Sequence, residues 1–132
     1  MSNYFADTFY YLALINPHDA THDRAVALSQ ELRGGQVTTA WVLTELADAL
    51  AASQRASFLA LLKRLRKQPH VTIVPAGQEL FEQGVDLYER RPDKTWTLTD
   101  CISFVVMEER GIREALTGDH HFEQAGFVAL LG

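Results

Sequence analysis

The chain has 132 residues and a formal net charge of −5, with 47% apolar and 22% charged residues. This length suits one domain with its own core, so we expect residues 1–132 to form a single domain. The acidic balance argues against a protein that binds nucleic acid through a broad basic surface, and the single cysteine excludes an internal disulfide or a multi-cysteine zinc site.

Short strand-like runs alternate with helical segments along the whole sequence. In chain order we predict a strand at 3–7, helices at 8–15 and 21–33, a strand at 36–39, helices at 40–52 and 54–68, a strand at 71–75, helices at 77–91 and 97–111, a strand at 114–119, a short helix at 120–126 and a strand at 127–131.

Local signals support several of these boundaries. Gly34 and Gly35 are expected to stop the second helix, and Pro69 to end the fourth. The helix over 97–111 is apolar from Cys101 to Met107 apart from Ser103, so we expect it to be buried on most sides.

The alternation of strands and helices predicts an α/β fold with a parallel or mostly parallel sheet covered on both faces. Ligands of such sheets bind beyond the carboxyl ends of the strands. This edge is therefore the place to look for functional side chains.

Three aspartates stand where a predicted strand meets a helix or where a helix begins: Asp7, Asp100 and Asp119. Each could simply cap its helix, and Thr97 with Asp100 resembles a capping box. Glu45 differs, because three of its four neighbours at helical spacing are apolar, which points it toward the core, although it could also extend outward from the margin of that face.

Four carboxylates gathered in one cleft would repel each other and raise each other's pKa. Divalent hard cations relieve that repulsion, and sites built only of oxygen ligands suit Mg²⁺ or Mn²⁺. Such a site is what metal-assisted cleavage of a phosphodiester requires.

The adjacent histidines His120 and His121 are a second metal candidate. Neighbouring residues on a helix point about a third of a turn apart, so they should not converge on one ion. We therefore interpret them as surface or partly packed side chains and assign the metal to Asp119.

Basic residues gather on the predicted helix over 54–68, where a solvated face is the alternative interpretation. Together with Lys94, residues of this helix such as Arg55 and Lys63 could hold a nucleic-acid backbone. The N-terminus has no basic region before its apolar stretch, and no apolar run is long enough to span a membrane, so we expect a cytoplasmic protein.

Four blocks of the sequence resemble the PIN-domain family, specifically its small VapC-type toxins. They are "YFADTFYYLALINPHDATH", "TTAWVLTELADAL", "TWTLTDCISFVVMEERGI" and "EALTGDHHFEQAGF", in the family's order and at its spacing. The pair of "LTDC" and "TGDHHF" about nineteen residues apart is the more specific signal.

The resemblance implies a three-layer α/β/α sandwich and a Mg²⁺- or Mn²⁺-dependent endoribonuclease. The family's four acids fall on Asp7, Glu45, Asp100 and Asp119, which would hold the metal and carry the catalysis. Thr8 and Thr117 match hydroxyl residues that would orient these carboxylates, whereas Phe122 and Gly126 match a packing and turn signature. A toxin of this kind would act on RNA, bind an antitoxin protein and form a homodimer.

Two other functions fit the sequence less well. A non-catalytic RNA- or protein-binding module on the same fold would not need all four acids. A phosphohydrolase with a nucleophilic aspartate at Asp7 would carry a second aspartate two residues later, where this chain has Phe9.

Overall fold

The structure is a computed structural model that describes residues 3–132. The strands are β1 (Asn3–Ala6), β2 (Gly35–Thr39), β3 (Val71–Val74), β4 (Glu114–Leu116) and β5 (Val128–Ala129). The helices are α1 (Thr8–Ile15), α2 (His22–Glu31), α3 (Ala40–Leu50), α4 (Arg55–Lys67), α5 (Gln78–Arg90), α6 (Leu98–Arg110) and α7 (His120–Gln124).

The five strands form one sheet in the order β3-β2-β1-β4-β5. All four pairings are parallel, so the sheet that we predicted to be mostly parallel is parallel throughout. β1 is central: Phe5 pairs with Val37 of β2 on one side and with Ala115 of β4 on the other.

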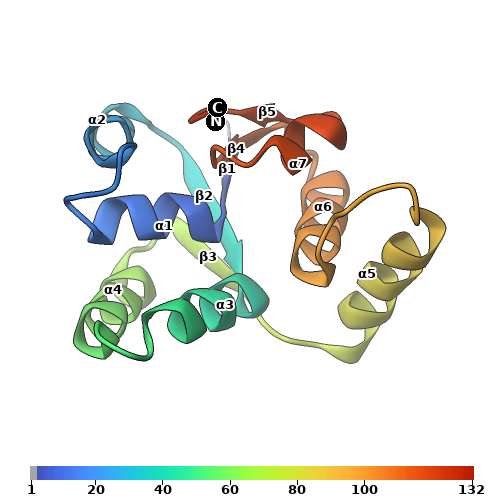
Figure 1. Cartoon of the computed structure of the whole chain (residues 1–132), viewed down its shortest axis with the longest axis horizontal. Coiled ribbons are helices and arrows are strands. Elements are labelled where there is room, and N and C mark those ends of the chain that lie inside the picture. Colours follow the sequence, from blue (N-terminus) through green and yellow to red (C-terminus); the bar gives the residue numbers. More distant parts are fainter. Residues whose placement is uncertain (1–2) are drawn as a thin grey trace.

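Helices cover both faces of the sheet, as the predicted α/β/α sandwich requires. Figure 1 shows α1 to α4 on one side of the strands and α5 to α7 on the other. This division follows from right-handed crossovers, because the chain moves from β1 outward to β2 and β3, then returns past β1 to β4 and β5. The order reverses between β1 and β4, which is where such sheets open a crevice for ligands.

The core beneath this crevice is apolar and aromatic. Phe5, Phe122 and Met107 are fully buried, and Phe104 meets Phe122 edge-to-face with ring centroids 4.9 Å apart. The apolar segment of α6 is buried from Cys101 to Met107 except for the half-buried Val105, as predicted. α5 lies against α6 at Gly84, where a side chain would collide with Ile102.

Some predicted boundaries were wrong by a few residues. α2 ends at Glu31 rather than at the glycines, because the backbone of Leu32 is already extended (φ −71°, ψ 139°). β4 ends at Leu116 instead of residue 119, since the Thr117 hydroxyl accepts the amide hydrogen of Asp119 and turns the chain. The last strand shrinks to Val128–Ala129.

Within residues 3–132 no helix combines the length and the apolar character needed to cross a membrane.

Candidate metal centre

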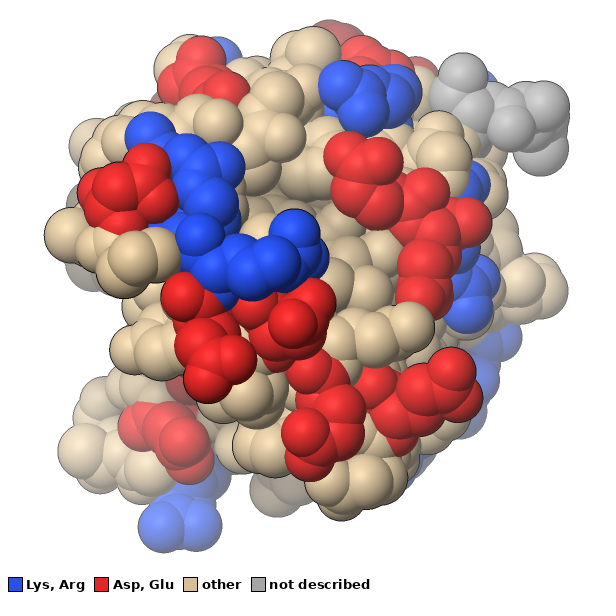
Figure 2. Space-filling view, turned by 90° about the vertical axis from the view of Figure 1, so that its right-hand side faces the viewer, with Lys and Arg blue, Asp and Glu red and all other residues tan. Residues whose placement is uncertain are grey.

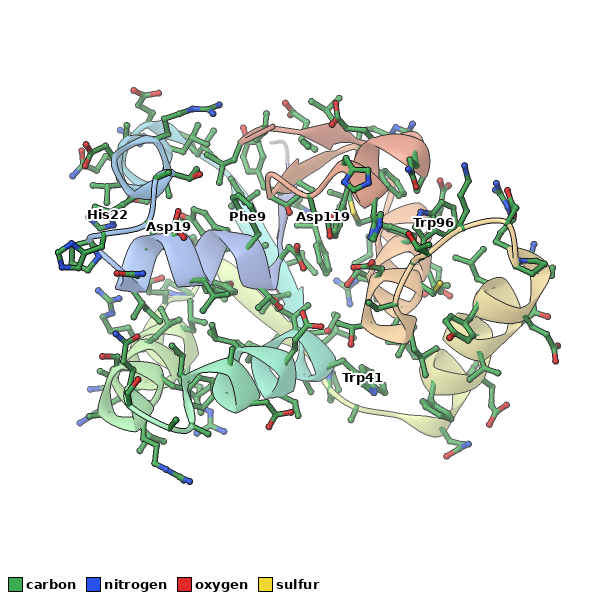
Figure 3. All side chains as sticks on the ribbon, viewed as in Figure 1. Phe9, Asp19, His22, Trp41, Trp96 and Asp119 are labelled. Carbon is green, nitrogen blue, oxygen red and sulfur yellow. The ribbon has the colours of Figure 1, made fainter. Side chains whose placement is uncertain are left out.

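A cleft of about 420 Å³ opens at the carboxyl ends of β1 and β4 and contains all four acids that the sequence singled out. Its lining consists of Asp7, Thr8, Phe9, Glu45, Thr97, Asp100, Asp119 and His121. The structure therefore brings together side chains that are up to 114 positions apart in the sequence. Figure 3 shows Phe9 and Asp119 near the centre of the molecule, between α1 and α6.

Asp7 is the most buried of the four acids, with 5% of its surface exposed. It occupies the N-cap position of α1, but its side chain makes no capping hydrogen bond. Instead, Oδ2 accepts a hydrogen bond from the hydroxyl of Thr117 at 2.9 Å. Burial raises the pKa of Asp7 from 3.8 to about 7; the Thr117 hydrogen bond opposes the shift, and the negative charges of Asp100 and Glu45 add to it.

Glu45 enters the cleft from α3, which begins where β2 ends. Thr39 caps this helix by accepting the amide hydrogen of Val42, which fixes where the helix starts and hence which face meets the cleft. The hydroxyl of Thr8 donates a hydrogen bond to Glu45 Oε1. Thr8 and Thr117 thus each hold a carboxylate of the cleft, as the family resemblance implied.

Asp100 has the capping role that the sequence suggested. Its Oδ2 accepts from the amide of Thr97, and the hydroxyl of Thr97 accepts from the amide of Asp100, which completes a capping box at the start of α6. The same oxygen lies 2.9 Å from Nδ1 of His121. Asp100 is buried, yet it lines the cleft, so one carboxylate both caps its helix and faces the site.

Asp119 caps the short helix α7 by accepting the amide hydrogen of His121 at 2.9 Å. This turn brings both histidines back toward the carboxylate: Nδ1 of His120 lies 3.8 Å and Nδ1 of His121 lies 3.5 Å from Asp119 Oδ1. One donor atom from each of these three residues fits within a 4.8 Å group that could hold a metal ion. Our argument that adjacent histidines must diverge was therefore wrong for this turn.

The two histidines differ in their surroundings. The His120 side chain is 71% exposed, whereas that of His121 is 16% exposed and lies in the cleft, where Nε2 is 3.3 Å from the hydroxyl of Thr95. Sequence analysis missed His121 as a residue of the site. The available signal was the Asp119-x-His121 spacing, which lets the aspartate cap the amide two residues later and keeps the ring nearby.

The donor set of the cleft fits a hard divalent cation. Four carboxylates supply oxygen ligands, and no lysine or arginine of residues 3–132 forms an ion pair with any of them. A buried carboxylate without a cationic partner, such as Asp7, is costly in its charged form. An added cation would favour that form.

The fold places the basic residues that we predicted to contact the RNA backbone in two separate regions. Arg55 and Lys63 belong to α4, which packs on the side of α3 away from α6 in Figure 1. Lys94 instead lies in the segment between α5 and α6 that leads into the cleft at Thr97. Of the three candidates, the fold favours Lys94.

The chain is similar to known proteins over nearly its whole length. The sequence profile of the PIN domain matches residues 4–128. VapC20, named a 23S rRNA-specific endonuclease in two strains of Mycobacterium tuberculosis, is 33% identical over 126 residues, which are 94% of this chain and 95% of the relative.

Solved structures agree with this relationship. The crystal structure of the M. tuberculosis VapC20 toxin, described as cleaving the sarcin–ricin loop, has a TM-score of 0.86 at 28% identity and covers 96% of this chain and 97% of that one. Two more distant structures share the fold: FitAcB of Neisseria gonorrhoeae (TM-score 0.65, 19% identity, coverage 95% and 94%) and VapBC2 of Rickettsia felis bound to promoter DNA (0.66, 13%, 96% and 96%).

The fold, the cleft at its topological switch point and these similarities lead to one assignment: this chain belongs to the PIN-domain family and is a VapC-type endoribonuclease.

Proposed function

We propose that Asp7, Glu45, Asp100 and Asp119 bind Mg²⁺ or Mn²⁺ and that this site hydrolyses RNA phosphodiester bonds. The proposal rests on the surroundings of the Asp7 carboxylate. Its carboxylate is buried beside two other acids, is not used to cap α1, and has a pKa raised to about 7. A divalent cation would favour the charged carboxylates over their protonated forms.

Neighbouring hydroxyls preorganise these ligands. Thr117 bridges two acids, donating to Asp7 and accepting the amide hydrogen of Asp119, and Thr8 holds Glu45. Carboxylates fixed in this way need little rearrangement when a cation and a phosphate enter. When bound, a divalent cation lowers the pKa of water and neutralises charge on the phosphate oxygens.

Glu45 is the acid best placed to orient the attacking water. It is half-buried and reaches the cleft from α3, opposite α6, which carries Asp100. Its carboxylate accepts only the Thr8 hydroxyl among the hydrogen bonds of residues 3–132, which leaves an oxygen available for water or metal. Asp119, with 29% of its side chain exposed, would contact the cation from the solvent side.

The biological role that we propose is the toxin of a type II toxin–antitoxin pair. Such a toxin would act in the cytoplasm, would be held inactive by an antitoxin protein and would form a homodimer. Because the VapC20 relative is named for cleaving 23S rRNA, we propose the sarcin–ricin loop as the first structured RNA to test.

The test is RNA cleavage by metal-stripped protein with Mg²⁺, Mn²⁺ or EDTA. Substrates are a mixed single-stranded RNA pool and a sarcin–ricin stem-loop. Asp7→Asn is the inactive variant, and Asp23→Asn, an exposed acid in the first turn of α2, is the matched control.

Cleavage that needs metal, is lost in Asp7→Asn and survives in Asp23→Asn is the expected result. Cleavage that persists in EDTA, or that Asp7→Asn retains, would overturn the proposed site. Calorimetric titration of Mn²⁺ into both variants provides a second readout, since only Asp23→Asn should bind the metal like the parent protein.

A further inference from the structure

A second pocket adjoins the candidate metal centre. It has a volume of about 570 Å³ and lies between α5 and the segment that connects α5 to α6. Its lining consists of Val85, Tyr88, Glu89, Arg91, Pro92, Lys94, Thr95, Trp96 and Cys101. Figure 3 places Trp96 on the α5 side of Asp119.

The pocket and the catalytic cleft share a wall. Thr95 and Trp96 line the pocket, and Thr97, the next residue, lines the cleft. The contact between the Thr95 hydroxyl and Nε2 of His121 connects the two sites directly, because the other nitrogen of this ring contacts Asp100. An RNA strand that is cleaved at the four carboxylates can therefore place an adjacent nucleotide in the pocket.

The shared wall is held in place by its own contacts. Arg91 donates two hydrogen bonds to Asp93 and lies 5.1 Å from the centre of the Trp96 ring. The indole of Trp96 donates to Gln124 at 2.9 Å. The backbone is fixed as well, since the amide of Lys94 donates to the carbonyl of Arg91.

Against this fixed wall, two side chains are free to bind a ligand. Tyr88 is 52% exposed and takes part in none of the ring–ring contacts among residues 3–132. Lys94 is half-buried in the pocket and forms no ion pair within the same described range. An exposed aromatic ring beside an unpaired cation is the combination that single-stranded nucleic acids use for stacking and backbone contact.

Basic and acidic side chains gather separately on the surrounding face. Figure 2 shows one continuous group of basic side chains on the α5–α6 side, bordered by acidic side chains. Glu89 also lines the pocket and would repel a phosphate held deep inside it, whereas its carboxylate can accept a hydrogen bond from an exocyclic amine.

We propose that this pocket binds a nucleotide next to the cleaved bond, with its base stacked on Tyr88 and its sugar-phosphate near Lys94 and Thr95. The pocket would then select which base flanks the cut. This inference rests on the proposed ribonuclease function.

Binding is measured in EDTA, where cleavage does not interfere. A short fluorescein-labelled single-stranded RNA of mixed sequence is titrated with the parent protein and with Tyr88→Leu, Tyr88→Phe and Lys94→Ala. Leu59→Ala is the control, because Leu59 is a similarly exposed apolar residue (61%) on the distant helix α4.

Tyr88→Leu should weaken binding roughly five- to hundredfold, the range for loss of one base–aromatic stack, whereas Tyr88→Phe keeps the ring and should bind like the parent. Lys94→Ala should weaken binding and reduce its dependence on salt. In Mg²⁺, Tyr88→Leu should also change the distribution of cut positions in the RNA pool.

Unchanged RNA affinity and unchanged cut positions in Tyr88→Leu would overturn the inference. Equal weakening in Leu59→Ala would do the same, since it would indicate non-specific adhesion. RNA binding that depends on Tyr88 in a protein that never cleaves RNA would support the pocket and refute the proposed metal-dependent activity, so the two proposals can fail separately.

Discussion

Asp7 and Asp100 both stand at the start of a helix that borders the cleft, but the two helices use them differently. α6 uses the carboxylate of Asp100, which accepts the amide hydrogen of Thr97 in a capping box. α1 receives no capping hydrogen bond from the carboxylate of Asp7, which accepts instead from the hydroxyl of Thr117 and is close enough to the Thr8 amide for that amide to lower its pKa. An acid at a helix start is therefore no evidence of function by itself; an acid there that caps nothing requires another explanation.

The largest expected effect is on catalysis by Asp7→Asn. The amide keeps the shape of the side chain and can still accept the Thr117 hydrogen bond, but it removes the charge that a cation would need. We expect RNA cleavage to fall at least roughly a hundredfold, measured as initial rate in Mg²⁺. A loss of less than about tenfold would show that the buried carboxylate is not a ligand.

In the metal-free protein, the raised pKa of Asp7 should make the free energy of unfolding depend on pH. Because its pKa is raised from 3.8 to about 7, the folded protein holds this proton more tightly than the unfolded chain does. The resulting stability is fully present below about pH 4 and is lost as the pH rises through about 7.

As the pH rises from about 5 to about 8, ionisation of Asp7 should lower the free energy of unfolding by on the order of 2–3 kcal/mol. Urea unfolding in EDTA at the two pH values measures the difference. Asp7→Asn should abolish most of it and be the more stable protein at the higher pH, whereas identical pH profiles for parent and variant would contradict the shifted pKa.

Asp100→Asn should have the opposite effect on stability. The asparagine oxygen can still accept from Thr97, but the negative charge at the start of α6 is gone, so we expect a loss of about 0.5–1 kcal/mol, or a few degrees in melting temperature. Thermal unfolding in EDTA near neutral pH is the measurement. A melting temperature equal to or above that of the parent would mean that repulsion among the acids outweighs the cap.

The contrast between these acids also marks the limit of what the sequence could predict. Periodicity placed every helix and strand, because apolar spacing and turn residues are local signals, and the positions of Asp7 and Asp119 after strands followed from them. The capping box of Thr97 and Asp100 was equally local. The absence of a cap at Asp7 was not predictable, since it depends on Thr117, which is 110 positions away.

The cleft position of His121 was missed for a related reason. Our prediction assumed regular helical geometry, in which neighbouring side chains diverge, but α7 has only five residues and begins in a turn that Asp119 closes. In so short a helix, side-chain direction is set by the cap and by tertiary contacts with Thr95 and Asp100 rather than by helical period. The second pocket depends in the same way on how the 91–97 segment folds over α6.

The smallest expected effect tests the two histidines against each other. His120 is exposed, lies 3.8 Å from Asp119 and packs beside the His121 ring with centroids 4.6 Å apart, so His120→Ala should leave metal-dependent cleavage within a few-fold of the parent. His121 contacts Asp100 at 2.9 Å and fixes Thr95, so His121→Ala should lower cleavage by roughly three- to tenfold, the effect of a group that positions a ligand. His121→Asn, which can place a hydrogen-bonding atom near that of Nδ1, should recover part of the loss.

Calorimetric titration of Mn²⁺ distinguishes positioning from ligation by these rings. If His121 only positions Asp100, its alanine variant should bind Mn²⁺ with a modestly weaker affinity and the same stoichiometry. A collapse of binding in His120→Ala would instead show that the close group of Asp119, His120 and His121 holds the ion itself. Asp7 and the two histidines would then share one property, because the fold would place their side chains to bind a cation and not to cap a helix.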